Sequence, residues 1–171
     1  MSELITERVC AEAEGGVVVF LIGMRVNKPW KVWKWLPVFA AMPRMLRELA
    51  ARPELGLLSA RGHFGLRNFM VLQYWRSAEH LRAYAHAANQ AHLPAWQAFN
   101  RAVGTGGDVG IWHETYMVRA GDYECIYVDM PRLGLEAAGV HVPVGSTGQS
   151  AARRIGATHV DEPAVTPYPN P

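Results

Sequence analysis

Continuous and alternating apolar stretches predict five β-strands along this chain. Residues 17–26 (VVVFLIGMRV) form a near-continuous apolar run rich in β-branched residues, which is typical of a strand covered on both faces. The stretch LRNFMVLQYW alternates, so that Phe69, Val71 and Trp75 share one face. A short link around Gly65 joins it to the preceding strand and predicts an antiparallel hairpin. The five predicted strands cover residues 17–26, 55–64, 66–75, 109–118 and 123–130.

Between these strands, apolar residues recur at helical spacing. A helix is predicted over residues 30–41, with a kink at Pro37 and a continuation that starts at Pro43. Ser77 is a favourable N-cap for a second helix, and a further helix is predicted over residues 93–103.

The order of these elements predicts the fold class. Strand, helix, strand, strand, helix, strand, with one extra strand, is the order of a ferredoxin-like α+β fold, an antiparallel sheet with helices on one face. The other sheet face is apolar as well, and pairing two sheets across a twofold axis would bury it. We therefore expect a homodimer of the dimeric α/β-barrel type. The predicted parts are an N-terminal lead-in over residues 1–16, one ferredoxin-like domain over residues 17–143 and an extended C-terminal tail over residues 144–171.

Composition and charge exclude several classes of protein. Half of the 171 residues are apolar, so one domain can bury an ordinary core, while two cysteines form neither a disulfide scaffold nor a four-cysteine zinc site. The net charge is only +2, and basic residues are mostly spaced singly, which disfavours nucleic-acid binding. The sequence shows no secretory signal and no stretch long enough to span a bilayer, so we expect a cytoplasmic protein without a transmembrane segment.

The segment GIWHETY, residues 110–116, carries the strongest candidate for chemistry. Strand alternation places His113 on one face with Ile111 and Thr115, and Trp112 on the other. One interpretation is a hydrogen-bonded core histidine. The functional interpretation is a general base or an axial metal ligand, because a neutral imidazole suits both roles.

Polar residues within the apolar strands are candidates for substrate binding. Arg25, Asn68 and Gln73 must each find a partner or face water, and Trp112 adjoins His113. The alternative for the three polar residues is exposure at a strand end. The zinc patterns HExxH and HxxEH are both absent, so we predict no metal-ion site formed by the protein alone.

Tryptophans crowd the first predicted helix. Trp30, Trp33 and Trp35 are accompanied by three lysines between residues 28 and 34. Packing in the core or at the dimer seam is the first interpretation. A helix lying on a membrane surface is the second, since interfacial helices combine tryptophan with lysine.

Three short motifs resemble a known family. They are WRSAEHL at residues 75–81, HLPAW at 92–96 and GIWHET at 110–115, and the likeness extends through YECIYVDMP at 123–131. The sequence resembles uncharacterised bacterial and fungal proteins grouped with the fumagillin-pathway monooxygenase, over about residues 17–143. This family is placed in the dimeric α/β-barrel superfamily, so the resemblance implies that fold and a monooxygenase-like activity.

A more distant likeness is to haem-containing aldoxime dehydratases. His113-Glu114, followed by Glu124-x-Ile126-Tyr127, is similar to the segment that carries their proximal haem histidine. The resemblance implies that His113 is an axial ligand of haem b. The position matching their distal histidine falls near Asp129-Met130, and no histidine is present there.

Three hypotheses about function follow. The leading one is a monooxygenase-like oxidoreductase that acts on a small hydrophobic metabolite in a barrel pocket. In its cofactor-free form His113 is the base, while Trp112, Gln73 and Arg25 position the substrate. The second is a haem enzyme with His113 as proximal ligand, and the third is a non-catalytic protein that binds a hydrophobic ligand.

Overall fold

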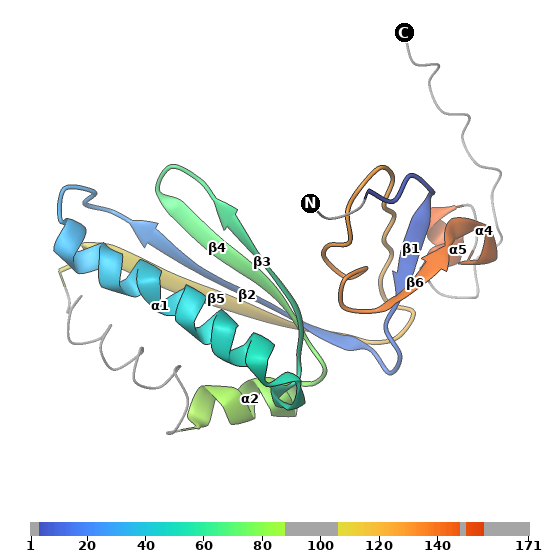
Figure 1. Ribbon diagram of the computed structural model, residues 1–171, viewed down its shortest axis with the longest axis horizontal. Coiled ribbons are helices and arrows are strands. Elements are labelled where there is room, and N and C mark those ends of the chain that lie inside the picture. The colour runs from blue at the N-terminus through green and yellow to red at the C-terminus, as the bar shows by residue number, and fades with distance from the viewer. Residues whose placement is uncertain (1–3, 88–105, 148–149, 156–171) are drawn as a thin grey trace, which may run out of the picture. The chain divides into compact units, whose positions relative to one another are not determined.

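The computed structural model describes residues 4–87, 106–147 and 150–155, which form two compact units (Figure 1). We call Val17–Met117 the sheet unit, and Met1–Gly16 together with Val118–Pro171 the terminal unit. The helix predicted over residues 93–103 lies outside the described residues.

The sheet unit contains a four-stranded sheet with the strand order β3-β4-β2-β5. This order, with the connection strand, helix, strand, strand, helix, strand, is the ferredoxin-like topology. The prediction of an α+β, ferredoxin-like fold, an antiparallel sheet with helices on one face, is confirmed. The elements are β2 (Val17–Val26), α1 (Val32–Ala51), the short 3₁₀ helix η1 (Pro53–Leu55), β3 (Leu57–Phe64), β4 (Asn68–Trp75), α2 (Ala78–His86) and β5 (Val109–Val118).

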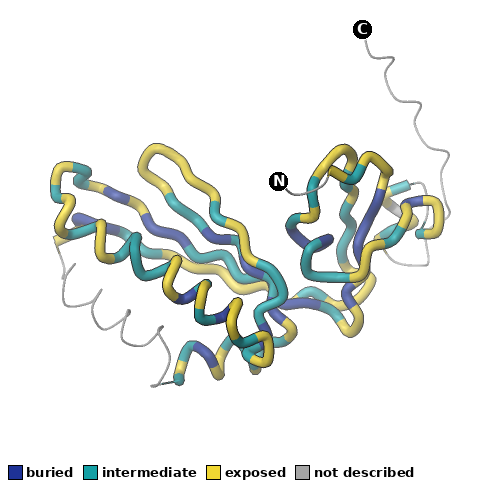
Figure 2. The backbone as a smooth tube through the Cα atoms, in the orientation of Figure 1, coloured by how far each residue is buried: buried dark blue, intermediate teal, exposed yellow. Residues whose placement is uncertain are grey.

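One face of this sheet is covered by helices and holds the core. Along β4, Val71 and Trp75 are buried, while Met70 and Leu72 on the other face are only half-buried, as the alternation predicts. Two buried clusters lie under the helices. The first contains Val18, Leu49, Trp75 and Tyr84, and the second contains Met24, Val26 and Val109. Figure 2 shows the buried positions along the central strands.

Helix α1 is one continuous element rather than two segments. Both Pro37 and Pro43 lie inside it, where each removes a backbone amide donor. The helix begins at Val32, and its N-cap residue Lys31 makes no side-chain capping hydrogen bond. Shortly before it, the Asn27 side-chain amide donates to the carbonyl oxygen of Gly107, 3.0 Å away. For α2, Ser77 is the N-cap that the sequence predicts, since its hydroxyl accepts from the amide of His80.

Asp108 holds the segment between β2 and α1 against the start of β5. Its backbone carbonyl accepts from the amides of Asn27 and Lys28. Its carboxylate, whose side chain is 6% exposed, pairs with the ammonium groups of Lys28 at 2.7 Å and Lys31 at 3.0 Å. Hydrogen bonds from Lys28 and Lys31 hold the pKa of Asp108 below its usual value.

We predict that Asp108→Asn destabilises the protein at neutral pH. Because folding lowers this pKa, the carboxylate contributes stability above its unfolded value, near 3.8, and loses it as the pH falls through the folded value. Urea unfolding should therefore separate the variant from the wild type at neutral pH, and the gap should be smaller at about pH 3, below the unfolded pKa. Asp122→Asn is the control, since the exposed Asp122 forms no ion pair among the described residues. An equal gap at both pH values would contradict the prediction.

The terminal unit differs from what the sequence predicts. The predicted lead-in over residues 1–16 contains a strand, β1 (Val9–Glu12), which pairs antiparallel with β6 (Val140–Pro143). The start of the predicted extended tail forms two short helices, α4 (Val144–Thr147) and α5 (Ala151–Arg154). A four-residue strand is too short for its period to show in the sequence. Its partner also lies more than a hundred residues away, so no local pattern predicts the pairing.

The strand predicted over residues 123–130 is wrong. This segment makes only isolated bridges with the N-terminal residues, Val9 to Tyr127 and Ile5 to Met130. The amide of Ala11 donates a hydrogen bond to the thiol of Cys125 at 3.2 Å. In a regular β-sheet this amide would donate to a backbone carbonyl of the neighbouring strand. Asp129 has a φ of 53°, which breaks the extended backbone.

Candidate functional site

His113 lies on β5, on the sheet face against which α1 packs. The same face of β5 carries Val109 and Ile111, which belong to or pack against the second core cluster. The imidazole centre is 5.8 Å from the ring centre of Phe20 on β2, with the two ring planes inclined by 43°. The alternation that groups His113 with Ile111 is therefore confirmed.

The His113 side chain is exposed, and so are Thr115 and Met117 on the same side of β5. Met117 alone is 76% exposed. We call Phe20, Ile111, His113, Thr115 and Met117 the His113 surface. Within the described part of the chain, the imidazole has no hydrogen-bond partner, so a neutral ring has one nitrogen available to accept and the other to donate. A ring in this state does not match the interpretation of a hydrogen-bonded core histidine.

Gln73 lies on the same sheet face but in the core. It is register partner to Phe20 and is 4% exposed. Its carbonyl oxygen accepts from the indole nitrogen of Trp75 at 2.8 Å, and its amide nitrogen lies 3.9 Å from the sulfur of Met42. These contacts satisfy the side chain internally, so in this structure Gln73 supports the core beside the His113 surface.

The other predicted binding residues lie on the opposite face, which we call the open face. Arg25 donates to the side-chain oxygen of Asn68 at 3.0 Å across β2 and β4. Trp112 lies over Gly23, where a Cβ would come within 2.5 Å of the indole nitrogen. The structure therefore brings Arg25, Asn68 and Trp112 to one face, and His113 and Gln73 to the other.

Two residues that shape these surfaces escaped the sequence reasoning. Phe20 stands in a uniformly apolar run, which offers no signal that one ring contacts His113. Gly23 did offer a signal, because a glycine inside a strand often marks the close approach of another group.

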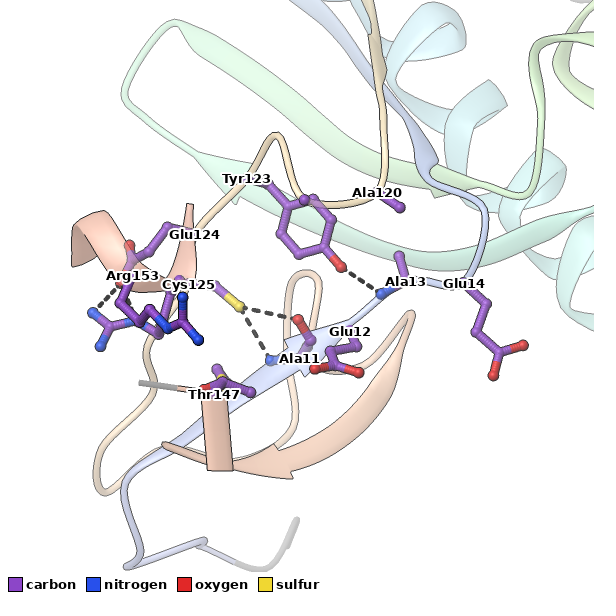
Figure 3. A pocket seen from close by; sticks show the side chains of 13 residues that line it. Ala11, Glu12, Ala13, Glu14, Ala120, Tyr123, Glu124, Cys125, Thr147 and Arg153 are labelled. Carbon is purple, nitrogen blue, oxygen red and sulfur yellow. Dashed lines mark hydrogen bonds and ion pairs between the residues drawn. The ribbon is translucent and has the colours of Figure 1, made fainter. Parts of the chain in front are cut away.

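The terminal unit contains a separate pocket of about 390 Å³, shown in Figure 3. Small side chains and both free cysteines line it, with charged residues around them. The guanidinium of Arg154, whose side chain is 8% exposed, pairs with the carboxylate of Glu124. The hydroxyl of Tyr123 accepts from the amide of Ala13 at 2.6 Å. The lining residues are Cys10, Ala11, Glu12, Ala13, Glu14, Ala120, Gly121, Tyr123, Glu124, Cys125, Thr147, Arg153 and Arg154.

The Cys125 thiol in this pocket is a poor candidate for chemistry. Burial raises the pKa of Cys125, so this thiol stays protonated at neutral pH and is a weak nucleophile. Cys125 is half-buried and forms no disulfide. Across the described residues, no three His, Cys, Asp or Glu side chains gather as a metal site would require. No helix among them combines the length and apolar character needed to cross a bilayer.

Comparison with solved structures shows the fold shared with aldoxime dehydratases. One aldoxime dehydratase superposes with a TM-score of 0.62 at 18% identity, over 81% of this chain and 44% of the enzyme. Aldoxime dehydratase OxdRE, in complex with butyraldoxime, superposes with a TM-score of 0.61 at 16% identity, over 81% of this chain and 45% of the enzyme.

Sequence comparison identifies a nearer relative. Monooxygenase af470 of Aspergillus fumigatus is 31% identical over an alignment 130 positions long, which covers 68% of this chain and 44% of the relative. The chain therefore spans less than half the length of that protein. Residues 17–135 match a family described as Monooxygenase af470-like. This range includes β2 to β5 and the first residues of the terminal unit that follow β5. The chain belongs to the Monooxygenase af470-like family.

Proposed function

We propose that this protein is a monooxygenase-like oxidoreductase that acts on a small hydrophobic metabolite at the His113 surface. The observation that carries the proposal is the exposed imidazole of His113, which lies against Phe20 and has no partner among the described residues. Membership of a monooxygenase-like family supports the reaction class. The cytoplasm is the compartment we propose.

The chemistry at this surface begins with a proton. A neutral imidazole can take the proton of an activated C–H or O–H group of a bound substrate, leaving an electron-rich anion. Phe20, Ile111 and Met117 provide apolar contacts for the substrate body. Apolar contact removes water from the anion, which makes it easier to oxidise. In the cofactor-free reaction, a substrate methylene and one O₂ become a carbonyl and one water, so the four electrons that reduce O₂ come from the substrate.

A haem-dependent version is supported by the shared fold with aldoxime dehydratases and by the residues present. The exposed His113 imidazole would hold the haem through a ring nitrogen, and Phe20 and Met117 would contact its apolar edge. Bound haem would supply redox-active iron for oxygen chemistry. In that version His113 would hold the group and would not act as a base.

Two measurements separate these versions from each other and from mere binding. Oxygen uptake is followed with a panel of hydroxylated polycyclic aromatic compounds that contain an activated methylene. The visible spectrum is recorded before and after addition of haem. Uptake by colourless protein that leaves added haem unchanged supports the cofactor-free reaction, whereas a Soret band and haem-dependent uptake support the second version. Saturable binding of the panel without uptake under either condition would overturn the proposed activity.

We also propose that the protein is a homodimer whose two sheets pair through their open faces. Half-buried apolar side chains of β2 and β4 lie on this face, Leu21, Met70 and Leu72 among them. Trp112 and Tyr116 of β5 add ring surface that is 39% and 50% exposed. Contiguous apolar surface of this kind is unusual on a monomer, and a second copy would cover it.

The Gly23→Ala substitution tests this arrangement. A Cβ at residue 23 would lie 2.5 Å from the Trp112 indole, so the ring must move away from β2. The displaced ring would then project from the open face and disturb the contact between the two sheets. We expect dimer dissociation to become at least about tenfold more favourable, measured by sedimentation velocity. Gly110→Ala is the matched control, because its Cβ would meet its nearest neighbours at 3.9 Å. A wild-type protein that is monomeric at micromolar concentration would refute the dimer.

A further inference from the structure

The first half of α1 exposes an apolar surface that neither the core nor the proposed reaction uses. Trp33 is 68% exposed, and Val32 and Leu36 are 43% and 47% exposed. Trp30, just before the helix, is 66% exposed. Four large apolar side chains within seven residues at this exposure are unusual, since such residues normally pack inward. We call Trp30, Val32, Trp33 and Leu36 the tryptophan patch.

The inward side of α1 is already occupied, so the tryptophan patch is not a misplaced core. Trp35, Val38 and Phe39 pack against the second core cluster, and Leu49 lies in the first. The Trp35 indole nitrogen also donates to the carbonyl of Pro29 at 2.9 Å. These contacts fix the rotation of the helix and keep Trp33 and Leu36 on its outer side, where Figure 2 shows exposed turns.

Positive charge accompanies the patch along the same helix. Steps of three or four residues lead from Trp33 past Leu36 and Ala40 to Arg44 and Arg47, both exposed. Between residues 28 and 52 the sequence contains six basic residues and one acid. That acid, Glu48, is paired with Arg52 and accepts from the hydroxyl of Tyr84. The exposed side of α1 therefore combines tryptophan with arginine and carries no carboxylate of its own.

We propose that the tryptophan patch and the adjacent arginines dock this protein on the surface of an anionic lipid bilayer. Indole rings favour the boundary between headgroups and acyl chains, and basic side chains are attracted to anionic headgroups. The geometry corresponds to a protein that lies on the membrane, since no described helix could cross it. Binding through this face does not require the reaction proposed at His113.

Vesicle co-sedimentation of the full-length protein tests the proposal. We expect binding to vesicles of phosphatidylcholine with about 40% phosphatidylserine, and little binding to phosphatidylcholine alone. Raising the salt from about 50 mM to about 500 mM should weaken the interaction with anionic vesicles. Equal binding to both vesicle types, or none to either, would overturn the proposal.

Paired substitutions assign the binding to this face. Trp30→Ala with Trp33→Ala should reduce the partition coefficient at least about tenfold, and Arg44→Glu with Arg47→Glu should do the same. Leu66→Ala, at a residue 98% exposed in the β3–β4 turn, is the matched control and should change it less than about twofold. Circular dichroism and sedimentation velocity verify that each variant keeps its fold and its oligomeric state. Full vesicle binding by the tryptophan pair, or a smaller oligomer as its only defect, would show that the patch serves another role.

Discussion

Replacing His113 with alanine is expected to lower turnover by about 10²–10⁴-fold, the range that a positioned general base contributes. The ring is exposed and lies beside the Phe20 ring, so its removal opens no core cavity. The fold should therefore survive, with a thermal midpoint close to that of the wild type. Oxygen uptake with the best compound of the aromatic panel measures the effect, and circular dichroism verifies the fold.

The His113→Ala result also distinguishes a base from a residue that merely lines the site. His63→Ala is the matched control, because His63 is exposed on β3 and its register with Met70 places it on the open face. Loss of activity caused by a missing base should respond to pH, so the acidic limb of the rate profile should disappear in the variant. A His113→Ala protein with wild-type turnover would remove His113 from the mechanism.

The sequence predicted the long strands of the sheet unit, because the two-residue repeat of a β-strand assigns each side chain to one face of the sheet. β4 alternates over eight residues, and β5 over ten, so their faces could be assigned without a structure. The same alternation placed His113 and Trp112 on opposite faces. It could not tell that Arg25 and Asn68 would share Trp112's face, because that depends on the pairing of β2 with β4.

The terminal unit could not be predicted in the same way. β1 pairs with β6, which follows it by more than a hundred residues, and no local pattern encodes such a partner. Residues 123–130 have strand-like composition, yet the Cys125 thiol and the left-handed Asp129 replace regular ladder contacts. The exposure of His113 is also a tertiary property, since alternation gives a residue its face and neighbouring elements decide what covers it.

These comparisons separate two roles for polar residues in apolar strands. Gln73 is hydrogen-bonded inside the core, where its side-chain carbonyl accepts from the indole of Trp75. On the open face, Arg25 donates to the side-chain oxygen of Asn68. Of the polar strand residues that the sequence singled out, His113 is the one whose polar atoms have no partner among the described residues, and an unused polar group on an apolar surface is where a substrate or ligand finds a partner.

Substitution of Trp75 with alanine is expected to have the largest effect on stability. Trp75 is 1% exposed and packs with Val18, Leu49 and Tyr84 under the helices. Its ring centre lies 5.8 Å from that of Tyr84. Removing a buried tryptophan typically costs about 3–5 kcal/mol, through lost burial and through the cavity that remains. For a chain of this length we expect the thermal midpoint to fall by about 10 °C or more.

The loss of stability on removing Trp75 has two sources, the lost packing of the ring and the lost hydrogen bond from its indole to Gln73. Trp75→Phe keeps most of the ring but leaves the buried carbonyl of Gln73 without its indole donor, so we expect a loss of about 1–3 kcal/mol. Adding Gln73→Leu should recover part of that loss, because the orphaned carbonyl is then absent. Trp33→Ala, at a residue 68% exposed, is the control and should change the unfolding free energy by less than about 0.5 kcal/mol. Urea unfolding of the four variants measures these differences. A Trp75→Ala protein as stable as the Trp33→Ala control would mean that the helices do not pack on the sheet through this cluster, and the His113 surface would then lose the support of the core beside it.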